Sequence, residues 1–237
     1  MKNFRQGKID NSGLNQIFGS SAEDWDKEFW REYRWAYRRH METVDRELGV
    51  MLKGLKDAGL EDNTVIVFTS DHGDHDGAHQ LTMKRSFYEE SANVPLIVSW
   101  KGHCTPGTVD STTLVVNGLD VIPTLCDIAD IKAPEQLRGV SFLSAAQGRP
   151  LDRDFIVVQN NTGRMLRTAQ YKYAVYYRNG QSEEQLFDMY SDRLEMNNLA
   201  KKASHSQIIE NYRELLRAWT IENKDTKGKK YLSALTD

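Results

Sequence analysis

The sequence predicts an α/β protein: a mixed, largely parallel sheet with flanking helices, followed by a small antiparallel α+β subdomain. Three observations carry this prediction. An apolar run at residues 64–69 ends abruptly in a loop rich in Asp, His and Gly, as at the carboxyl end of a central strand in an open sheet. A long amphipathic stretch precedes this run. After residue 160, short β-rich segments alternate with turn residues.

The amphipathic stretch begins at Trp25 and ends near Gly59. Its apolar residues recur every three or four positions, the spacing of one helix face. They are Phe29, Tyr33, Tyr37, His40, Met41, Val44, Leu48, Met51, Leu52 and Leu55. We expect one long helix that packs on the sheet. Residues 1–22 show no periodicity and are interpreted as a loop or leader.

The run from Thr64 to Thr69 is almost entirely β-branched or aromatic. This composition favours a strand buried on both faces of a parallel sheet. Residues 94–100 form a second short apolar run, with Pro95 at its start, where a missing N–H is tolerated. Residues 117–129 carry apolar positions at threes and fours, which predicts a short helix.

The C-terminal third is predicted to form β-hairpins followed by a helix. Residues 155–158 are predicted as the last strand of the large sheet, and short strands follow at 165–168, 171–177 and 185–189. The face formed by Ile208, Ile209, Tyr212, Leu215, Leu216 and Trp219 predicts a final helix. Residues 224–230 are expected to be a mobile charged tail. The predicted division is 1–159 for the α/β part and 160–237 for the small subdomain.

Composition excludes some classes of partner. The 237 residues include 31 Lys plus Arg and 34 Asp plus Glu, which gives a net charge of −3. This balance lacks the excess of positive charge typical of proteins that bind nucleic acid or an anionic membrane. No apolar stretch approaches the roughly 18 residues of a spanning helix, and the first residues lack the apolar run of a signal peptide. The sequence therefore does not indicate the cellular compartment of the protein. Cys104 and Cys126 fit neither a disulfide framework nor a zinc site and are expected to be free thiols.

The loop after residue 69 holds the candidate chemistry. Asp71 and His72, beside Gly73, can aim an oxygen and a nitrogen at one cation. A polar surface loop is the alternative, but three aspartates and three histidines directly after a buried strand disfavour it. With only two ligands the site would be weak, and Asp74 or Asp76 could complete it.

Four stretches of the sequence together resemble the sulfatase family of the alkaline phosphatase superfamily. They are NTVIVFTSDHG at 63–73, GAH at 77–79, KRSFYEES at 84–91 and VPLIV at 94–98. The match covers nearly the whole chain but only the C-terminal half of a sulfatase. It implies a partial alkaline-phosphatase-like fold and a sulfuric ester hydrolase acting on a sulfated small molecule or sulfated sugar. Full-length relatives are often periplasmic, secreted or lysosomal.

The resemblance implies roles for five residues. Asp71 and His72 would supply half of a divalent metal site, with calcium the usual ion and manganese or zinc favoured by the His72 nitrogen. Lys84 would be the catalytic and substrate-binding lysine on the sulfate group and leaving oxygen. His79 would lie in the substrate pocket or be structural. Asp120 matches a helix residue that is architectural rather than catalytic.

The family nucleophile is a formylglycine made from Cys/Ser-x-Pro-x-Arg. Cys104-Thr105-Pro106-Gly107-Thr108 is a near miss, with Thr108 where the motif has arginine, and it follows the Asp-His-Gly strand instead of preceding it. We therefore interpret Cys104 as a loop thiol, expect the nucleophile in a missing N-terminal part, and expect the isolated chain to be inactive.

Two rival functions stay open. The first is a phosphodiesterase or phosphonate monoester hydrolase of the same superfamily. The second is a non-catalytic, metal-binding or interaction fragment of a split or degenerate sulfatase. In each case Asp71, His72 and Lys84 should share one cleft, with the amine within about 10 Å of the metal ligands. An apolar strand without its neighbours further predicts a homo-oligomer, association with the missing half, or local disorder in residues 73–84.

Overall fold

The computed structural model describes residues 25–235, so the prediction for residues 1–22 lies outside the described part. The chain forms two compact units. One contains residues 25–84 and 93–152, and the other contains residues 85–92 and 153–235. Within the described residues no helix has the length and apolarity needed to cross a membrane.

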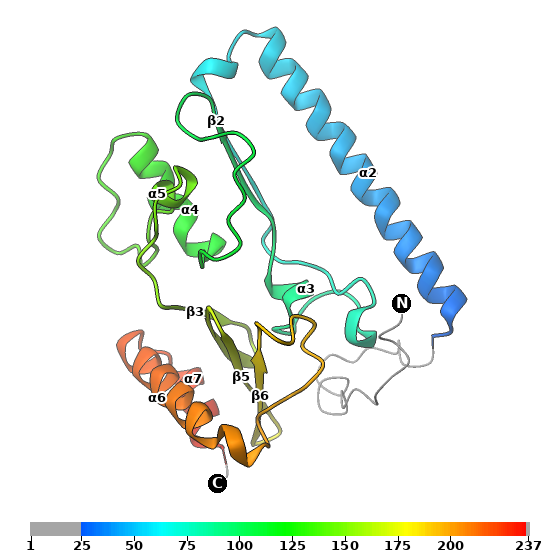
Figure 1. Cartoon of the computed structure of the whole chain (residues 1–237), viewed down its shortest axis with the longest axis vertical. Coiled ribbons are helices and arrows are strands. Elements are labelled where there is room, and N and C mark those ends of the chain that lie inside the picture. Colours follow the sequence, from blue (N-terminus) through cyan, green and yellow to red (C-terminus); the bar gives the residue numbers. More distant parts are fainter. Residues whose placement is uncertain (1–24, 236–237) are drawn as a thin grey trace. The chain divides into compact units, whose positions relative to one another are not determined.

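In the first unit, helix α2 spans Lys27–Asp57 as one unbroken helix (Figure 1). Asp26 caps it by accepting the Phe29 N–H at 2.9 Å. The predicted long helix is thus confirmed. No residue of α2 is buried, so the expected packing of this helix against a sheet is not found among the described residues.

A two-stranded ribbon follows the single turn η3 (Glu61–Asn63). Strand β1 (Val65–Thr69) pairs antiparallel with β2 (Leu96–Trp100), with Val65 opposite Trp100 and Thr69 opposite Leu96. The predicted parallel pairing is wrong for the described residues. A parallel partner of β1 would need a connection that crosses back to the Val65 end of the strand. Here the connection leaves β1 at Thr69 and enters β2 at Leu96, directly opposite Thr69. The side chains of β1 are half-buried rather than covered on both faces.

Helix α4 (Asn117–Ile128) lies in the predicted place, and the short α5 spans Leu143–Ala146. Asp120 is fully buried at the start of α4. Its carboxylate accepts the N–H groups of Val116 at 2.7 Å and Val140 at 2.9 Å, tying two loop segments to the helix. This confirms the architectural role expected for Asp120.

The second unit is built on a four-stranded antiparallel sheet in sequence order. Its strands are β3 (Phe155–Gln159), β4 (Gly163–Thr168), β5 (Tyr171–Arg178) and β6 (Gln181–Asp188). The predicted antiparallel subdomain is therefore confirmed. The prediction that residues 155–158 end the large sheet is wrong, because they pair with β4, the next strand along the chain.

Two helices lie along this sheet (Figure 1), after the single turn η5 (Ala203–His205). Helix α6 (Ser206–Glu222) is the predicted final amphipathic helix. Helix α7 (Thr226–Ser233) replaces the expected mobile tail. Asp225 caps α7 by accepting the Gly228 N–H at 3.0 Å, and Tyr231 and Leu232 are buried in the core, so apolar burial orders this charged segment.

Strand β5 is buried on both faces, and the two faces have different neighbours. Tyr173 and Val175 point into the apolar core shared with α6 and α7. Alternate residues of a strand point to opposite sides, so Lys172 and Tyr176 face away from those helices. That second face is covered by residues 85–92, which contain the short helix α3 (Glu89–Ala92).

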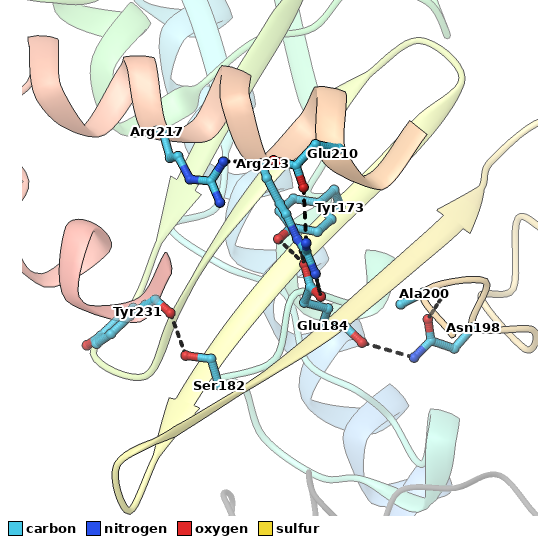
Figure 2. Close-up of polar contacts among 9 residues, drawn as sticks. All are labelled: Tyr173, Ser182, Glu184, Asn198, Ala200, Glu210, Arg213, Arg217 and Tyr231. Atoms are coloured by element: carbon cyan, nitrogen blue, oxygen red, sulfur yellow. Dashed lines mark hydrogen bonds and ion pairs between the residues drawn. The ribbon is translucent and has the colours of Figure 1, made fainter. Parts of the chain in front are cut away.

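A partly buried polar network joins the helix-side face to α6 (Figure 2). Glu184 on β6 receives the Tyr173 hydroxyl at 2.5 Å and two N–H groups of Arg213 at 2.8 and 2.6 Å. Arg213 also pairs with Glu210, as does the more exposed Arg217. Burial and the Glu184 charge raise the pKa of Tyr173, so its hydroxyl remains a donor.

The loop between β1 and β2 folds back on itself through backbone bonds. The His75 N–H donates to the Met83 carbonyl at 2.9 Å, and the Gly77 N–H donates to the Leu81 carbonyl at 3.1 Å. Between them lies the single turn η4 (Ala78–Gln80). Gly77 has a left-handed φ of 86°, and a Cβ there would lie 2.9 Å from the Trp30 ring. This part of the loop has a defined structure, unlike the local disorder that was one expectation.

His75 is almost completely buried in this loop. Burial disfavours the charged imidazolium and lowers the pKa of His75 to about 4. His75 therefore remains neutral at physiological pH, although the sequence places it among acidic residues.

Replacing Arg213 with alanine should lower the free energy of unfolding of the second unit by about 2–3 kcal/mol, because the Glu184 carboxylate loses its partly buried partner. Arg217→Ala is the matched control on the same helix and should cost less than about 1 kcal/mol. Urea unfolding followed by circular dichroism measures both losses. Equal losses would contradict the role assigned to Glu184.

Acidification should weaken the loop through His75. Its folded pKa lies below its ordinary value of 6.5, so stability is lost as pH falls from about 6.5 towards 4, on the order of 2 kcal/mol near pH 5. Unfolding of the wild type and His75→Gln should be compared at pH 7 and pH 5. The wild type should lose more stability than the variant; a pH-independent difference would count against a buried neutral His75.

Candidate functional site

The candidate site begins where β1 ends. The Ser70 carbonyl accepts a hydrogen bond from the Asn117 side chain at the start of α4. The Ser70 hydroxyl donates to the His72 carbonyl at 2.8 Å. These two bonds fix the turn that presents Asp71 and His72, and both involve residues that the sequence alone did not single out.

The His72 ring has one defined tautomer in this geometry. Its Nδ1 lies 2.9 Å from the Gly73 carbonyl oxygen. A carbonyl only accepts, so Nδ1 carries the proton and Nε2 carries the lone pair. A backbone partner on one ring nitrogen is the usual way in which proteins orient a metal-ligating histidine.

Asp71 directs one carboxylate oxygen towards His72 Nε2. Its Oδ1 accepts the His72 N–H at 3.0 Å, while its Oδ2 lies 3.3 Å from His72 Nε2. Metal–ligand bonds of about 2.0–2.4 Å at near-octahedral or tetrahedral angles separate adjacent donors by roughly 3–3.6 Å. The donor types and the spacing therefore fit two ligands of one divalent cation. The Asp71 side chain is 82% exposed and that of His72 is 38% exposed, so solvent reaches the pair.

The side chain of Lys84 also reaches His72 Nε2. Its Nζ lies 2.5 Å from His72 Nε2, far inside the expected range of about 10 Å. An ammonium can only donate, which agrees with a lone pair on Nε2. Lys84 follows Asp71 by thirteen positions, and the hydrogen bond from the His75 N–H to the Met83 carbonyl reverses the chain between them.

His79 differs in character from these three residues. It is 5% exposed and has a left-handed φ of 53° inside η4. Asp71 and Lys84 are exposed. Burial at a strained backbone position favours the structural alternative for His79 over direct contact with a substrate.

Asp74 and Asp76, the candidate extra ligands, are engaged with α2. Asp74 Oδ1 accepts the Tyr33 hydroxyl at 3.3 Å and the Asp76 N–H at 2.8 Å, and Asp76 pairs with Arg34 Nε at 2.9 Å. Burial, followed by the Asp74 charge, raises the pKa of Tyr33 to about 12. These contacts explain the two aspartates as loop anchors. No local pattern in the sequence pairs them with residues some forty positions earlier.

Both cysteines are free thiols, as predicted: Cys104 is half-buried and Cys126 is buried. Within residues 25–235, no hydrogen bond or ion pair joins Cys104 to Asp71, His72 or Lys84. The candidate site thus consists of a carboxylate, an imidazole and an ammonium.

Comparisons with known proteins identify the family of the chain. The family model described as Sulfatase matches residues 4–131, and that described as N-sulphoglucosamine sulphohydrolase, C-terminal, matches residues 77–222. A Delta 4,5-hexuronate-2-O-sulfatase from Bacteroides thetaiotaomicron is 32% identical over 217 residues, which cover 87% of this chain and 45% of that protein.

Solved structures give the same result. A structure described as a 2-O GAG sulfatase superposes with a TM-score of 0.79 at 32% identity, covering 88% of this chain and 47% of that one. A phosphonate monoester hydrolase from Agrobacterium radiobacter superposes with a TM-score of 0.71 at 26% identity, covering 86% and 44%. The chain spans less than half the length of these relatives. It belongs to the sulfatase family of the alkaline phosphatase superfamily, a family of sulfuric ester hydrolases.

Proposed function

We propose that Asp71, His72 and Lys84 form part of the active site of a sulfate ester hydrolase. The observation that carries the proposal is the convergence of Asp71 Oδ2 and Lys84 Nζ on His72 Nε2, at 3.3 and 2.5 Å. Membership of the sulfatase family supplies the reaction class.

Asp71 Oδ2 and His72 Nε2 are the groups that would hold a divalent cation. When bound, such an ion supplies Lewis acidity and a template for a sulfate oxygen. Calcium suits an all-oxygen site, whereas the imidazole ligand favours manganese or zinc. Two protein ligands bind weakly by themselves, so we propose that the relatives' remaining length contributes further ligands.

The Lys84 ammonium would supply the positive charge that stabilises the sulfate group during the reaction. His72 Nε2 has one lone pair, which cannot serve a cation and the Lys84 ammonium together. With Nε2 given to a cation, the Lys84 ammonium would be available to contact the anionic sulfate. There it offsets charge developing on the leaving oxygen as the S–O bond breaks.

The attacking group is the part that these 237 residues do not provide. The sequence holds no Cys/Ser-x-Pro-x-Arg motif, and Cys104 lies in a half-matching segment. We propose that a formylglycine outside the present residues is the nucleophile. The present chain then orients the substrate and the cation without covalent catalysis.

A sulfated sugar is the proposed substrate class, because the relative matched over 87% of this chain is named as a hexuronate sulfatase. Phosphonate monoester hydrolysis is the second candidate, favoured by the similarity to the Agrobacterium enzyme. Comparing aryl sulfate with aryl phosphonate hydrolysis by the full-length gene product separates the two. Failure of both substrates would favour a non-catalytic metal-binding module.

Calorimetric titration with manganese or calcium should show weak binding, with a dissociation constant of roughly 10⁻⁴–10⁻³ M. Asp71→Asn should weaken this binding on the order of tenfold, because it removes a charged ligand. Asp62→Asn, an exposed aspartate of the same unit paired with Lys101, is the control and should leave binding unchanged. Submicromolar affinity would mean that further ligands complete the site.

Inorganic sulfate should bind the manganese-loaded chain at the Lys84 ammonium, and calorimetric titration with sulfate measures this binding. Lys84→Ala should weaken sulfate binding on the order of tenfold without weakening manganese binding, because the ammonium contacts the anion rather than the cation. Lys101→Ala is the matched control, an exposed lysine in the same unit. Equal effects of the two lysine variants would remove the assigned role of Lys84.

The isolated chain should not turn over 4-nitrophenyl sulfate, since electrostatic stabilisation remains but covalent catalysis does not. A colorimetric assay on purified chain with saturating manganese or calcium measures this. Turnover that survives purification and is abolished by Cys104→Ala would overturn the expectation and make Cys104 the candidate nucleophile.

A further inference from the structure

The first half of helix α2 presents one strip of side chains to the loop that follows β1. Trp30, Tyr33, Arg34 and Tyr37 are half-buried, while the other residues from 31 to 38 are exposed. Residues three and four positions apart lie on the same face of a helix, so these four side chains form one continuous strip. The strip and the loop both belong to the first unit.

Two polar side chains of this strip hold the beginning of the loop. The Tyr33 hydroxyl donates to Asp74 Oδ1 at 3.3 Å, and Arg34 Nε donates to Asp76 Oδ2 at 2.9 Å. Asp74 Oδ1 also accepts the Asp76 N–H at 2.8 Å. The two aspartates are thus bonded to the helix and to each other.

The Tyr33 hydroxyl meets the loop a second time, at Met83. Burial and the Asp74 charge raise the pKa of Tyr33 to about 12, whereas a hydrogen bond with the Met83 backbone lowers it. A backbone group that favours the charged phenolate is an N–H, so the hydroxyl oxygen accepts from Met83 while its proton goes to Asp74. The hydroxyl therefore joins the loop two residues after His72 to the loop one residue before Lys84.

Two of the loop residues that α2 contacts have a backbone conformation that is unfavourable for a residue with a Cβ. Asp76 has a φ of 47° and Met83 a φ of 65°, both in the left-handed region. Such conformations persist where surrounding contacts hold them. Arg34 supplies a contact at Asp76, and Tyr33 supplies one at Met83.

The position of Met83 sets the starting point of the Lys84 side chain. Lys84 follows Met83 directly, so the two Cα atoms are about 3.8 Å apart. The Met83 carbonyl accepts the His75 N–H at 2.9 Å, and the Met83 N–H meets the Tyr33 hydroxyl. Both polar groups of the Met83 backbone are thus fixed. From this fixed point the Lys84 ammonium reaches His72 Nε2 at 2.5 Å.

We propose that Tyr33 is a positioning residue for Lys84. Its hydroxyl ties the two ends of the loop together, and this tie holds the Lys84 ammonium beside His72. The role rests on the proposed function of Lys84. A charge that is held in place before an anion arrives loses less conformational freedom on binding it, so the tie favours binding as well as stability.

The test compares Tyr33→Phe with Tyr37→Phe, each of which removes one hydroxyl from the same strip of α2. Tyr37 is the matched control. Burial, followed by the charges of Asp74 and Asp76, raises its pKa, but within residues 25–235 no hydrogen bond joins its hydroxyl to the loop. The readout, taken without any ligand, is the ¹⁵N chemical shift of His72 Nε2, which senses the Lys84 hydrogen bond. Urea unfolding of each variant measures stability separately.

Tyr33→Phe is expected to move the His72 signal towards that of Lys84→Ala, whereas Tyr37→Phe should leave it at the wild-type position. A wild-type signal in Tyr33→Phe overturns the proposal, and so does an equal shift in both tyrosine variants. A wild-type signal in Lys84→Ala overturns it as well, since no bond to Lys84 would then exist to be positioned.

Binding of inorganic sulfate to the manganese-loaded chain separates this proposal from the proposed function. If wild type binds sulfate, Tyr33→Phe should bind it on the order of fivefold more weakly, as expected when one hydrogen bond no longer orders the charge, and Tyr37→Phe should bind it as wild type does. Unchanged sulfate affinity in Tyr33→Phe would overturn the positioning role. If wild type binds no sulfate, the proposed function fails, and the His72 signal alone decides whether Tyr33 positions Lys84.

If Tyr33→Phe does not fold, Asp74→Ala removes the same bond from the loop side, and sulfate binding decides. Loss of a negative charge by itself favours an anion, so weaker sulfate binding by Asp74→Ala would report lost positioning. Equal or stronger binding would overturn the proposal.

Discussion

The reversal of the chain between β1 and β2 is the constraint on which the candidate site depends. Strand β1 delivers Asp71 and His72 at its carboxyl end, but Lys84 comes thirteen residues after Asp71. The backbone bond from the His75 N–H to the Met83 carbonyl closes the intervening loop. Because the cost of closing this loop is met by backbone bonds and by burial of His75 and Leu81, the contact between Lys84 and His72 needs little further ordering.

Buried charges play a related part in the second unit. On one face of the sheet, Arg213 and Tyr173 satisfy Glu184; on the other, Glu89 and Glu195 surround Lys172. Such pairs add little net stability compared with apolar side chains, but they fix geometry, because each bond has a direction. Residues 85–92 are therefore held on this sheet by directional bonds from Lys172 and Tyr176 to the Phe87 backbone.

The chemistry available to these residues is electrostatic. A carboxylate, an imidazole and an ammonium can bind a cation and an anion side by side, and none of them is a strong nucleophile in this geometry. The chain belongs to the sulfatase family and spans less than half the length of the relatives it matches.

The sequence by itself determined the long helix at 27–57, the antiparallel C-terminal strands, the helix at 206–222 and the pair Asp71 and His72. Each of these is encoded by local periodicity or by adjacent residues, so a short window carries the signal. Only the tertiary structure decided the antiparallel pairing of β1 with β2, the membership of β3 in the second sheet, the order of α7 and the contacts of Asn117, Glu195 and Lys172. These depend on contacts between residues far apart in the chain. Apolar runs record that a strand will be buried but not its partner, and a lone lysine in a strand looks solvated until three distant acceptors enclose it.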